Sequence, residues 1–145
     1  YLPSPHSVPS APTWTGRSAR RWVSSDATSS RSPAHAVATD AFELPCRWVI
    51  HTVGPNAHRG QTDPALLASC FTRSLDVAGE LGARSVAFPA VSAGIYGWDP
   101  SEVAGIAVDA VRGHPALPGF DLVRFVLFGP STLDAFAAAL GAGRT

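Results

Sequence analysis

The chain has 145 residues, of which 46% are hydrophobic and 15% are charged, a composition typical of one globular domain with a core of its own. Its formal net charge is zero, so no global field favours nucleic acid or an anionic membrane as a partner, and an anionic ligand would have to be held locally. The sequence has neither an apolar run of about 18 residues nor a signal-peptide pattern, so we expect a cytoplasmic protein with no membrane partner.

Residues 1–33 differ in composition from the rest of the chain. They hold nine of the fifteen serines and five of the 13 prolines, and their apolar residues follow neither a helical nor a strand period. We expect a disordered or non-native segment here and a folded domain over residues 34–145. Because the change near Ala34 is abrupt and the chain contains no Met, we hypothesise that residues 1–33 are translated in a wrong frame or are the remnant of a truncated gene.

The first predicted element is a strand from Arg47 to Val53, which ends at the turn signal Gly54-Pro55. His51 lies within it, and we interpret this side chain as part of the core scaffold and not as a catalytic group. The two cysteines, Cys46 and Cys70, are too few for a disulfide framework and are predicted to be free, buried thiols.

A helix is predicted to begin at Pro64, with Asp63 as its N-cap, and to end at Gly82. Apolar residues recur on one face at helical spacing, which predicts a buried face and no catalytic role. This face comprises Leu67, Cys70 or Phe71, Ser74 or Leu75, Ala78 and Leu81. The opposite side, with Arg73, Asp76 and Glu80, is predicted to be solvated.

The stretch from Ser85 to Pro100 is predicted to form a strand, a loop and the start of a helix. Val86 to Phe88 are short and apolar enough for a strand buried on both faces, and Asp99 and Pro100 are helix-start signals for a helix to about Arg112. The loop between them is rich in small residues, which let main-chain N–H groups approach an anion at the carboxyl end of a strand.

Two further elements complete the chain. The apolar run from Leu122 to Phe128 predicts another strand covered on both faces, and Ser131 is predicted to cap a last helix that closes at Gly141. The alternation of strands and helices from Arg47 onward predicts a layered α/β domain.

Three motifs resemble the macrodomain family, which binds ADP-ribose and in many branches hydrolyses bonds to it. Pro-Ala-Val-Ser-Ala-Gly-Ile-Tyr-Gly at residues 89–97 closely resembles its phosphate loop, and Trp-Val-Ile-His-Thr-Val-Gly-Pro at 48–55 resembles the strand and turn before its central helix. Residues 66–75 are similar to that helix itself. The resemblance runs from about Ala36 to Leu140 and implies a three-layer α/β/α macrodomain-like fold.

The resemblance also implies a ligand site. Main-chain amides of the loop would wrap a diphosphate, Tyr96 would lie over the distal ribose, and Phe128 would stack on adenine unless it is an ordinary core residue. The implied ligand-binding residues are Val91, Ser92, Ala93, Gly94, Ile95, Tyr96, Gly97 and Phe128. No cofactor and no metal are expected.

Catalysis is a separate question, because the family carries an asparagine-glycine loop upstream of these motifs that positions the reacting water. Residues 1–33 contain no Asn, and the single Asn of the chain is Asn56. Two hypotheses therefore stay open. One is a hydrolase of ADP-ribosyl adducts or O-acetyl-ADP-ribose that is impaired by loss of this loop, with unknown catalytic residues. The other is a non-catalytic ADP-ribose or diphosphate-binding module, or an inactive remnant. Loss of upstream strands would also expose a sheet edge and favour self-association.

Overall fold

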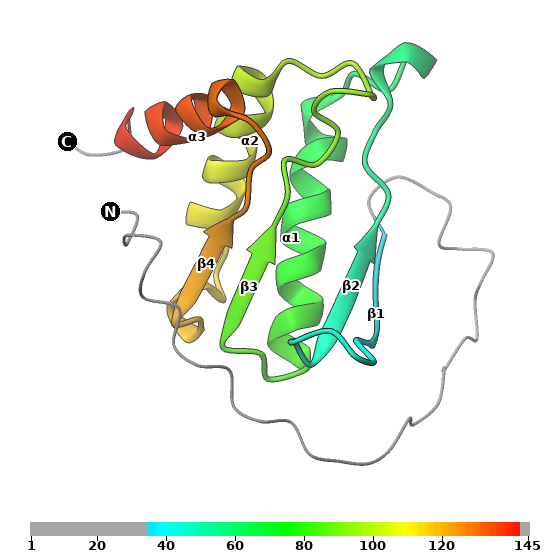
Figure 1. The fold of residues 1–145 in the computed structure, drawn as a ribbon, viewed down its shortest axis with the longest axis vertical. Helices are drawn as coiled ribbons and strands as arrows, with labels where there is room; N and C mark the ends of the chain where they lie inside the picture. The colour runs from blue at the N-terminus through cyan, green and yellow to red at the C-terminus, as the bar shows by residue number, and fades with distance from the viewer. Residues whose placement is uncertain (1–34, 143–145) are drawn as a thin grey trace.

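The computed structural model describes residues 35–142, so the expectations for residues 1–33 lie outside the described part of the chain. Within it, two consecutive strands are followed by helices that alternate with two further strands (Figure 1). The elements are β1 (Ala36–Asp40), β2 (Trp48–Thr52), η2 (Ala57–Arg59), α1 (Pro64–Glu80), β3 (Ser85–Phe88), α2 (Pro100–Arg112), η3 (Leu117–Gly119), β4 (Leu122–Phe125) and α3 (Pro130–Ala142). The expected mixed α/β class is confirmed.

The strands form two separate two-stranded sheets. β1 pairs antiparallel with β2, with Ala36 opposite Thr52, and β3 pairs in parallel with β4, with Ser85 opposite Leu122. In Figure 1, β2, β3 and β4 run in the same direction and α1 lies behind β2 and β3. Sequence reasoning did not anticipate β1.

The two long helices begin where the sequence predicts. The Asp63 carboxylate accepts a hydrogen bond from the amide of Ala65 (2.9 Å) at the start of α1, and Asp99 accepts one from Ser101 (2.7 Å) at the start of α2. Each side chain satisfies an amide that has no partner inside the helix. The predicted buried face of α1 is confirmed for Leu67, Cys70, Phe71, Ser74, Leu75 and Ala78, whereas Leu81, also predicted there, is only half-buried.

Aromatic rings tie α1 to the second sheet. The Phe71 ring lies 5.2 Å from that of Phe88 on β3 and 6.3 Å from that of Phe125 on β4. Phe136 of α3 lies 4.9 Å from Phe125. Phe71, Phe88 and Phe136 belong to a core cluster that also holds the buried residues of α2, and Phe125 packs against it, so the three helices and β3–β4 share one core.

The expectation that β3 and β4 are buried on both faces is wrong. Burial alternates along each strand: Phe88 is buried while Ala87 is exposed, and Leu122 and Arg124 are exposed. Alternation is typical of a sheet with one covered face. In the described part of the chain, the helices cover one face only.

The end of β4 and the start of α3 also differ from the prediction. β4 ends at Phe125, after which Val126 donates one more hydrogen bond to the carbonyl of Phe88 (2.8 Å) and the chain turns at Gly129 (φ 94°). α3 begins at Pro130, so Ser131 is a residue of the helix and not its cap. Apolarity alone misplaced the boundary, because residues 126–128 are apolar and outside the sheet.

An ion pair joins the amino ends of β3 and β4. The Arg84 guanidinium lies 2.9 Å from the Asp121 carboxylate, and the pair is exposed. The hydrogen bond and charge of Arg84 hold the pKa of Asp121 below its ordinary value. The same connection is made by the backbone, since the Asp121 amide donates to the Arg84 carbonyl (2.7 Å).

No helix within residues 35–142 combines the length and apolarity that crossing a membrane requires.

Replacing Phe71 by Ala removes the ring at the centre of the shared core and leaves a cavity. We expect Phe71→Ala to lower the free energy of unfolding by about 3–5 kcal/mol, measured by urea denaturation. The matched control is Phe128→Ala, because this side chain is 99% exposed and its removal should change stability by less than about 0.5 kcal/mol. Equal effects of the two substitutions would contradict this placement of the core.

Candidate functional site

Three connections meet at one end of the fold, where β2, β3 and β4 finish (Figure 1). They are residues 53–63 after β2, residues 89–99 after β3 and residues 126–129 after β4. The carboxyl ends of parallel strands are the usual ligand sites of α/β folds, because backbone N–H groups and helix starts gather there. This end of the fold is therefore the strongest candidate for a ligand site.

The connection after β3 has the backbone of an anion-binding loop. Ser92, Gly94 and Gly97 all adopt positive φ angles (66°, 85° and 80°). Alternation of left-handed and ordinary residues turns successive N–H groups toward a common concave side. A positive φ angle is energetically unfavourable for a residue with a side chain, such as Ser92. The rest of the structure must therefore hold the loop in this conformation.

Not all amides of this loop have a free hydrogen. Three of them donate to carbonyls two or three residues earlier: Val91 to Pro89 (3.0 Å), Ala93 to Ala90 (3.1 Å) and Gly97 to Gly94 (3.0 Å). The amides of Ser92, Ile95 and Tyr96 have no acceptor within residues 35–142. Fewer main-chain amides of this loop are thus available to an anion than the sequence suggested.

A second segment, Gly54 to His58, contacts the loop and holds it in place. The Ala57 amide donates to the carbonyl of Tyr96 (2.8 Å), and the buried indole of Trp98 donates to the carbonyl of Pro55 (3.1 Å). Sequence reasoning missed Trp98, since nothing in its local pattern shows that its partner lies 43 residues away.

Two glycines make this close approach possible. A Cβ atom on Gly54 would lie 2.3 Å from Oγ of Ser92, and one on Gly97 would lie 2.8 Å from the imidazole ring of His58. Real Cβ atoms do not approach other atoms so closely, so a side chain at either position would have to displace its neighbour, and Gly97 also has a positive φ (80°) that favours glycine. The loop and the segment below it therefore fit together as one unit.

Two hydroxyls near this junction have no partner. Oγ1 of Thr52, the last residue of β2, and Oγ of Ser92 are buried and make no hydrogen bond within the described residues. A buried hydroxyl without a partner costs about 1–3 kcal/mol, so such groups are few in native structures. An ordered water or a ligand at this end of the fold would satisfy each of them.

Large apolar side chains are exposed around the same end. Ile95 is 88% exposed and Phe128 99%, while Tyr96 is 36% exposed. The alternative that Phe128 is an ordinary core residue is wrong, because the chain leaves the sheet before it. Exposed aromatic and aliphatic groups beside a loop with free amides are typical of a ligand surface.

The start of α2 contributes little attraction for an anion. The Asp99 carboxylate already lies at this helix terminus as its cap, and its negative charge opposes the positive end of the helix dipole. Main-chain amides of the loop are therefore the main donors at this site.

Other residues that the sequence singled out lie elsewhere. His51 is exposed, contrary to the core interpretation, and is hydrogen-bonded to Oγ1 of Thr39 (2.9 Å), because its position on β2 faces away from α1. Cys46 is exposed, not buried, since it lies in the connection between β1 and β2, whereas Cys70 is buried on α1. Within residues 35–142, no cluster of three His, Cys, Asp or Glu side chains could hold a metal ion.

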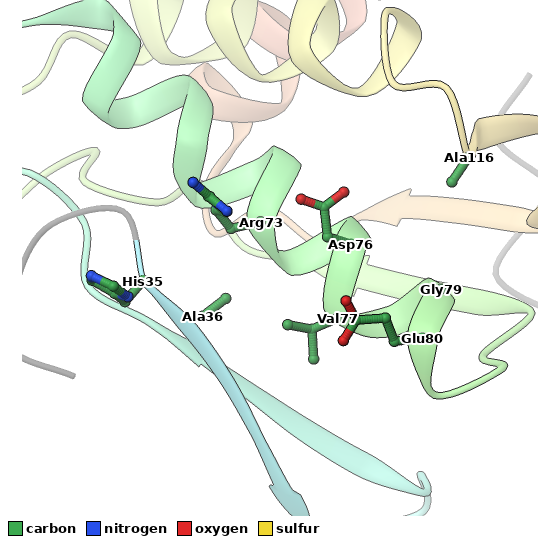
Figure 2. Close-up of a pocket in the computed structure, with 8 residues that line it drawn as sticks. All are labelled: His35, Ala36, Arg73, Asp76, Val77, Gly79, Glu80 and Ala116. Atoms are coloured by element: carbon green, nitrogen blue, oxygen red, sulfur yellow. The ribbon is translucent and has the colours of Figure 1, made fainter. Parts of the chain in front are cut away.

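A hollow of about 640 Å³ lies on the outer side of α1 (Figure 2). Arg73, Asp76 and Glu80 line it, together with His35, the residue before β1. It lies away from the loops described above, and its mixed charges single out no ligand class. We therefore place the candidate site at the loops.

Asp76 at this hollow has a structural partner that the sequence did not reveal. Nδ1 of the buried His114 accepts a hydrogen bond from the Ala116 amide (3.1 Å), so the ring proton is on Nε2 and is donated to Asp76 (2.8 Å). This bond fixes the connection after α2 to α1.

Comparison with known proteins identifies the class. The Macro domain family model matches residues 17–107, and a macro domain-containing protein of Streptomyces nogalater is 53% identical over 106 residues, covering 73% of this chain and 58% of the relative. An O-acetyl-ADP-ribose deacetylase of Enterobacter cloacae is 40% identical over 110 residues, covering 74% and 61%. The chain belongs to the macrodomain family.

Comparison with solved structures supports the same family assignment. The macrodomain of Oceanobacillus iheyensis with ADP superposes with a TM-score of 0.68 at 30% identity, covering 77% of this chain and 59% of that one. A Trypanosoma brucei macrodomain in complex with ADP-ribose gives 0.65 at 27% identity, covering 76% and 47%. These neighbours confirm the macrodomain fold. The chain spans about three fifths of the length of the curated relatives it matches.

Substituting Gly54 tests the fit between the two segments. Gly54→Ala places a methyl group against Oγ of Ser92 and Cγ1 of Val91 (2.3 and 2.8 Å), and we expect the free energy of unfolding to fall by about 1–3 kcal/mol. Gly105→Ala in α2 is the matched control, because no atom lies within 4 Å of its added Cβ. This control should stabilise the chain by about 0.5–1 kcal/mol. A neutral Gly54→Ala in urea denaturation would mean that the loop is not seated on Gly54.

Proposed function

We propose that this chain binds ADP-ribose at the carboxyl ends of β2, β3 and β4. The observation that carries the proposal is the loop of residues 91–97, in which the amides of Ser92, Ile95 and Tyr96 lack acceptors while the flanking amides hold the loop in shape. An anion with several oxygens fits this pattern. The family assignment supports a nucleotide diphosphate as that anion.

The diphosphate would be bound mainly by backbone. Each hydrogen bond from an amide to a charged oxygen contributes about 1.5–3 kcal/mol, and the loop is already ordered by its own hydrogen bonds and by Gly54 to His58. A preformed loop loses little entropy on binding. In this proposal Val91, Ala93, Gly94 and Gly97 shape the concavity and the other loop amides donate.

The exposed aromatic side chains support the sugar and base contacts. Tyr96 follows a donor amide and is partly exposed, which suits a contact with the distal ribose. Phe128 offers a free ring face after β4, which suits stacking on adenine. Phe128, at 99% exposure, has no packing role that would explain its position.

The names of related proteins favour the same ligand. The Trypanosoma brucei structure is a complex with ADP-ribose, and the Oceanobacillus iheyensis structures include one with ADP. At 27–30% identity, and with the loop motif present here, these neighbours support more than a shared fold.

We further propose binding without turnover by this chain. The asparagine-glycine loop that the resemblance associates with positioning the reacting water is not found in the sequence, whose single asparagine is Asn56. The alternative is hydrolysis of O-acetyl-ADP-ribose, favoured by the relatives from Enterobacter cloacae and Cronobacter sakazakii that are named O-acetyl-ADP-ribose deacetylases.

Calorimetric titration of the 145-residue chain with ADP-ribose tests the first proposal, and an O-acetyl-ADP-ribose hydrolysis assay tests the second. We expect saturable binding with one site and no release of acetate above the uncatalysed rate. AMP and free ribose are the controls, because neither carries a diphosphate and both should bind more weakly. Absence of ADP-ribose binding would contradict the proposed ligand, and acetate release would favour the deacetylase alternative.

Truncating Phe128 isolates the base contact. Because the side chain is 99% exposed, Phe128→Ala should leave stability unchanged and weaken ADP-ribose binding about 5- to 150-fold, the loss expected from one base-stacking contact. Phe42→Ala is the matched control, since Phe42 is also exposed but lies in the connection between β1 and β2. Equal affinities of the two variants would remove Phe128 from the site.

A further inference from the structure

The imidazole of His58 lies against the loop of residues 91–97. Its Cε1 and Nε2 atoms are each 2.8 Å, and its Nδ1 atom is 3.2 Å, from the position that a Cβ atom on Gly97 would take. Since glycine has no Cβ atom, the ring packs directly on the main chain of Gly97. Both residues are exposed, so the ring lies at the surface of the candidate site.

Hydrogen bonds fix the backbone that carries this ring. The amide of His58 donates to Oδ1 of Asn56 (3.0 Å), and the amide of Asn56 donates in turn to Oε1 of Gln61 (2.8 Å). The preceding residue, Ala57, is bonded across to the loop, because its amide donates to the carbonyl of Tyr96 (2.8 Å). The position of His58 relative to the loop is therefore set by the main chain on both sides of the contact.

Few charged groups lie in the three connections that form the candidate site. Their basic residues are His58 and Arg59, and their acidic residues are Asp63 and Asp99, whose carboxylates already cap α1 and α2. The remaining ionisable side chain of these connections is Tyr96. Of these side-chain types, only imidazole ordinarily changes its charge between about pH 5 and 8. His58 is thus the group through which pH can change the charge of this site.

The imidazole is also close to a free donor of the loop. The amide of Tyr96, which has no acceptor within residues 35–142, belongs to the residue directly before Gly97. Consecutive Cα atoms lie about 3.8 Å apart, so the ring is on the order of 10 Å or less from an anion bound to this amide. That distance is about one Debye length at 0.1 M salt, within which charges still interact. A protonated His58 would therefore attract such an anion, and a neutral one would not.

We propose that His58 is a specificity-determining residue of the ADP-ribose site, whose protonated imidazole favours a charged diphosphate. The inference rests on the proposed function, because it concerns the same ligand and the same loop. Each phosphate of ADP-ribose has one acidic oxygen that is ionised throughout this pH range, so the charge of the ligand stays constant while that of the imidazole changes. Protonation of His58 and binding of the ligand therefore favour each other, and the affinity falls as the pH rises.

Calorimetric titration of the 145-residue chain with ADP-ribose at about pH 5.5 and about pH 8 tests this inference. At low salt we expect about three- to tenfold tighter binding at the lower pH, the effect of one positive charge near a ligand with two negative charges. His58→Gln keeps a polar side chain without a titratable group, and its affinity should be nearly the same at both pH values. This variant keeps the other four of the five histidines, so the difference between the two proteins reports on His58 alone.

Two further variants separate the charge of this side chain from its packing. His58→Arg carries a positive charge at both pH values, so it should abolish the pH dependence and bind ADP-ribose more tightly than His58→Gln at about pH 8. Arg59→Gln is the matched control, because it removes a neighbouring charge that does not titrate in this range, and it should keep the ratio of affinities of the unaltered chain. Thermal unfolding of each variant at both pH values checks that the fold is intact.

Proton uptake on binding gives a second measurement. Titrations near about pH 6.5 in two buffers of different ionisation enthalpy should show that the unaltered chain takes up a fraction of a proton with ADP-ribose, whereas His58→Gln should take up none. Equal affinities of the unaltered chain at both pH values, or a pH dependence that persists in His58→Gln, overturn this inference and leave the proposed ligand standing. Absence of ADP-ribose binding at either pH contradicts the proposed ligand itself, and this inference with it.

Discussion

The packing of α1 against both sheets is the constraint on which the described structure depends. No backbone ladder connects β1–β2 to β3–β4, so the sheets are held together by side chains and by the loops that follow them. Phe71 contacts the rings of β3 and β4, and Cys70, one residue away on the same helix face, lies 3.4 Å from the carbonyl of Val53 just after β2. One apolar helix face therefore sets the distance between the two halves.

The loop junction is the second link between the halves, and it lies at the candidate site. Segment 54–58 belongs to the half with β2, whereas loop 89–98 belongs to the half with β3. Their contacts are short and specific: an amide on the carbonyl of Tyr96, an indole on the carbonyl of Pro55, and a serine side chain against Gly54. Any change in the distance between the sheets would move the two segments relative to each other. The shape of the loop of residues 91–97 is thereby coupled to the packing of α1.

The sequence predicted the helices well because their signals are local. Asp63 and Asp99 are caps whose side chains bond amides two residues away, and the apolar spacing of α1 follows directly from its buried face. The predictions that failed depended on contacts between distant residues. The continuous apolar run from Leu122 to Phe128 suggested a longer β4. Whether the last of these residues, Phe128, is buried depends on which parts of the chain pack beyond the end of the strand, and its own neighbours in sequence do not show this. β1, with the sequence Ala-Val-Ala-Thr-Asp, is too mixed in composition to be distinguished from a connection without its partner β2.

The loop of the candidate site was predicted from the sequence through its motif, whereas the contacts that support the loop were not. The spacing of small residues from Ser92 to Gly97 indicates amides that can approach an anion, but it does not show which amides are already bonded. That distinction depends on the left-handed turns at Ser92, Gly94 and Gly97, which direct some N–H groups back into the loop and others outward. The position of Ser92 depends on its left-handed backbone and on the absence of a side chain at Gly54, which leaves room for the Ser92 hydroxyl. A motif match therefore identifies the loop, and the segment 38 residues earlier determines whether it keeps a shape suited to an anion.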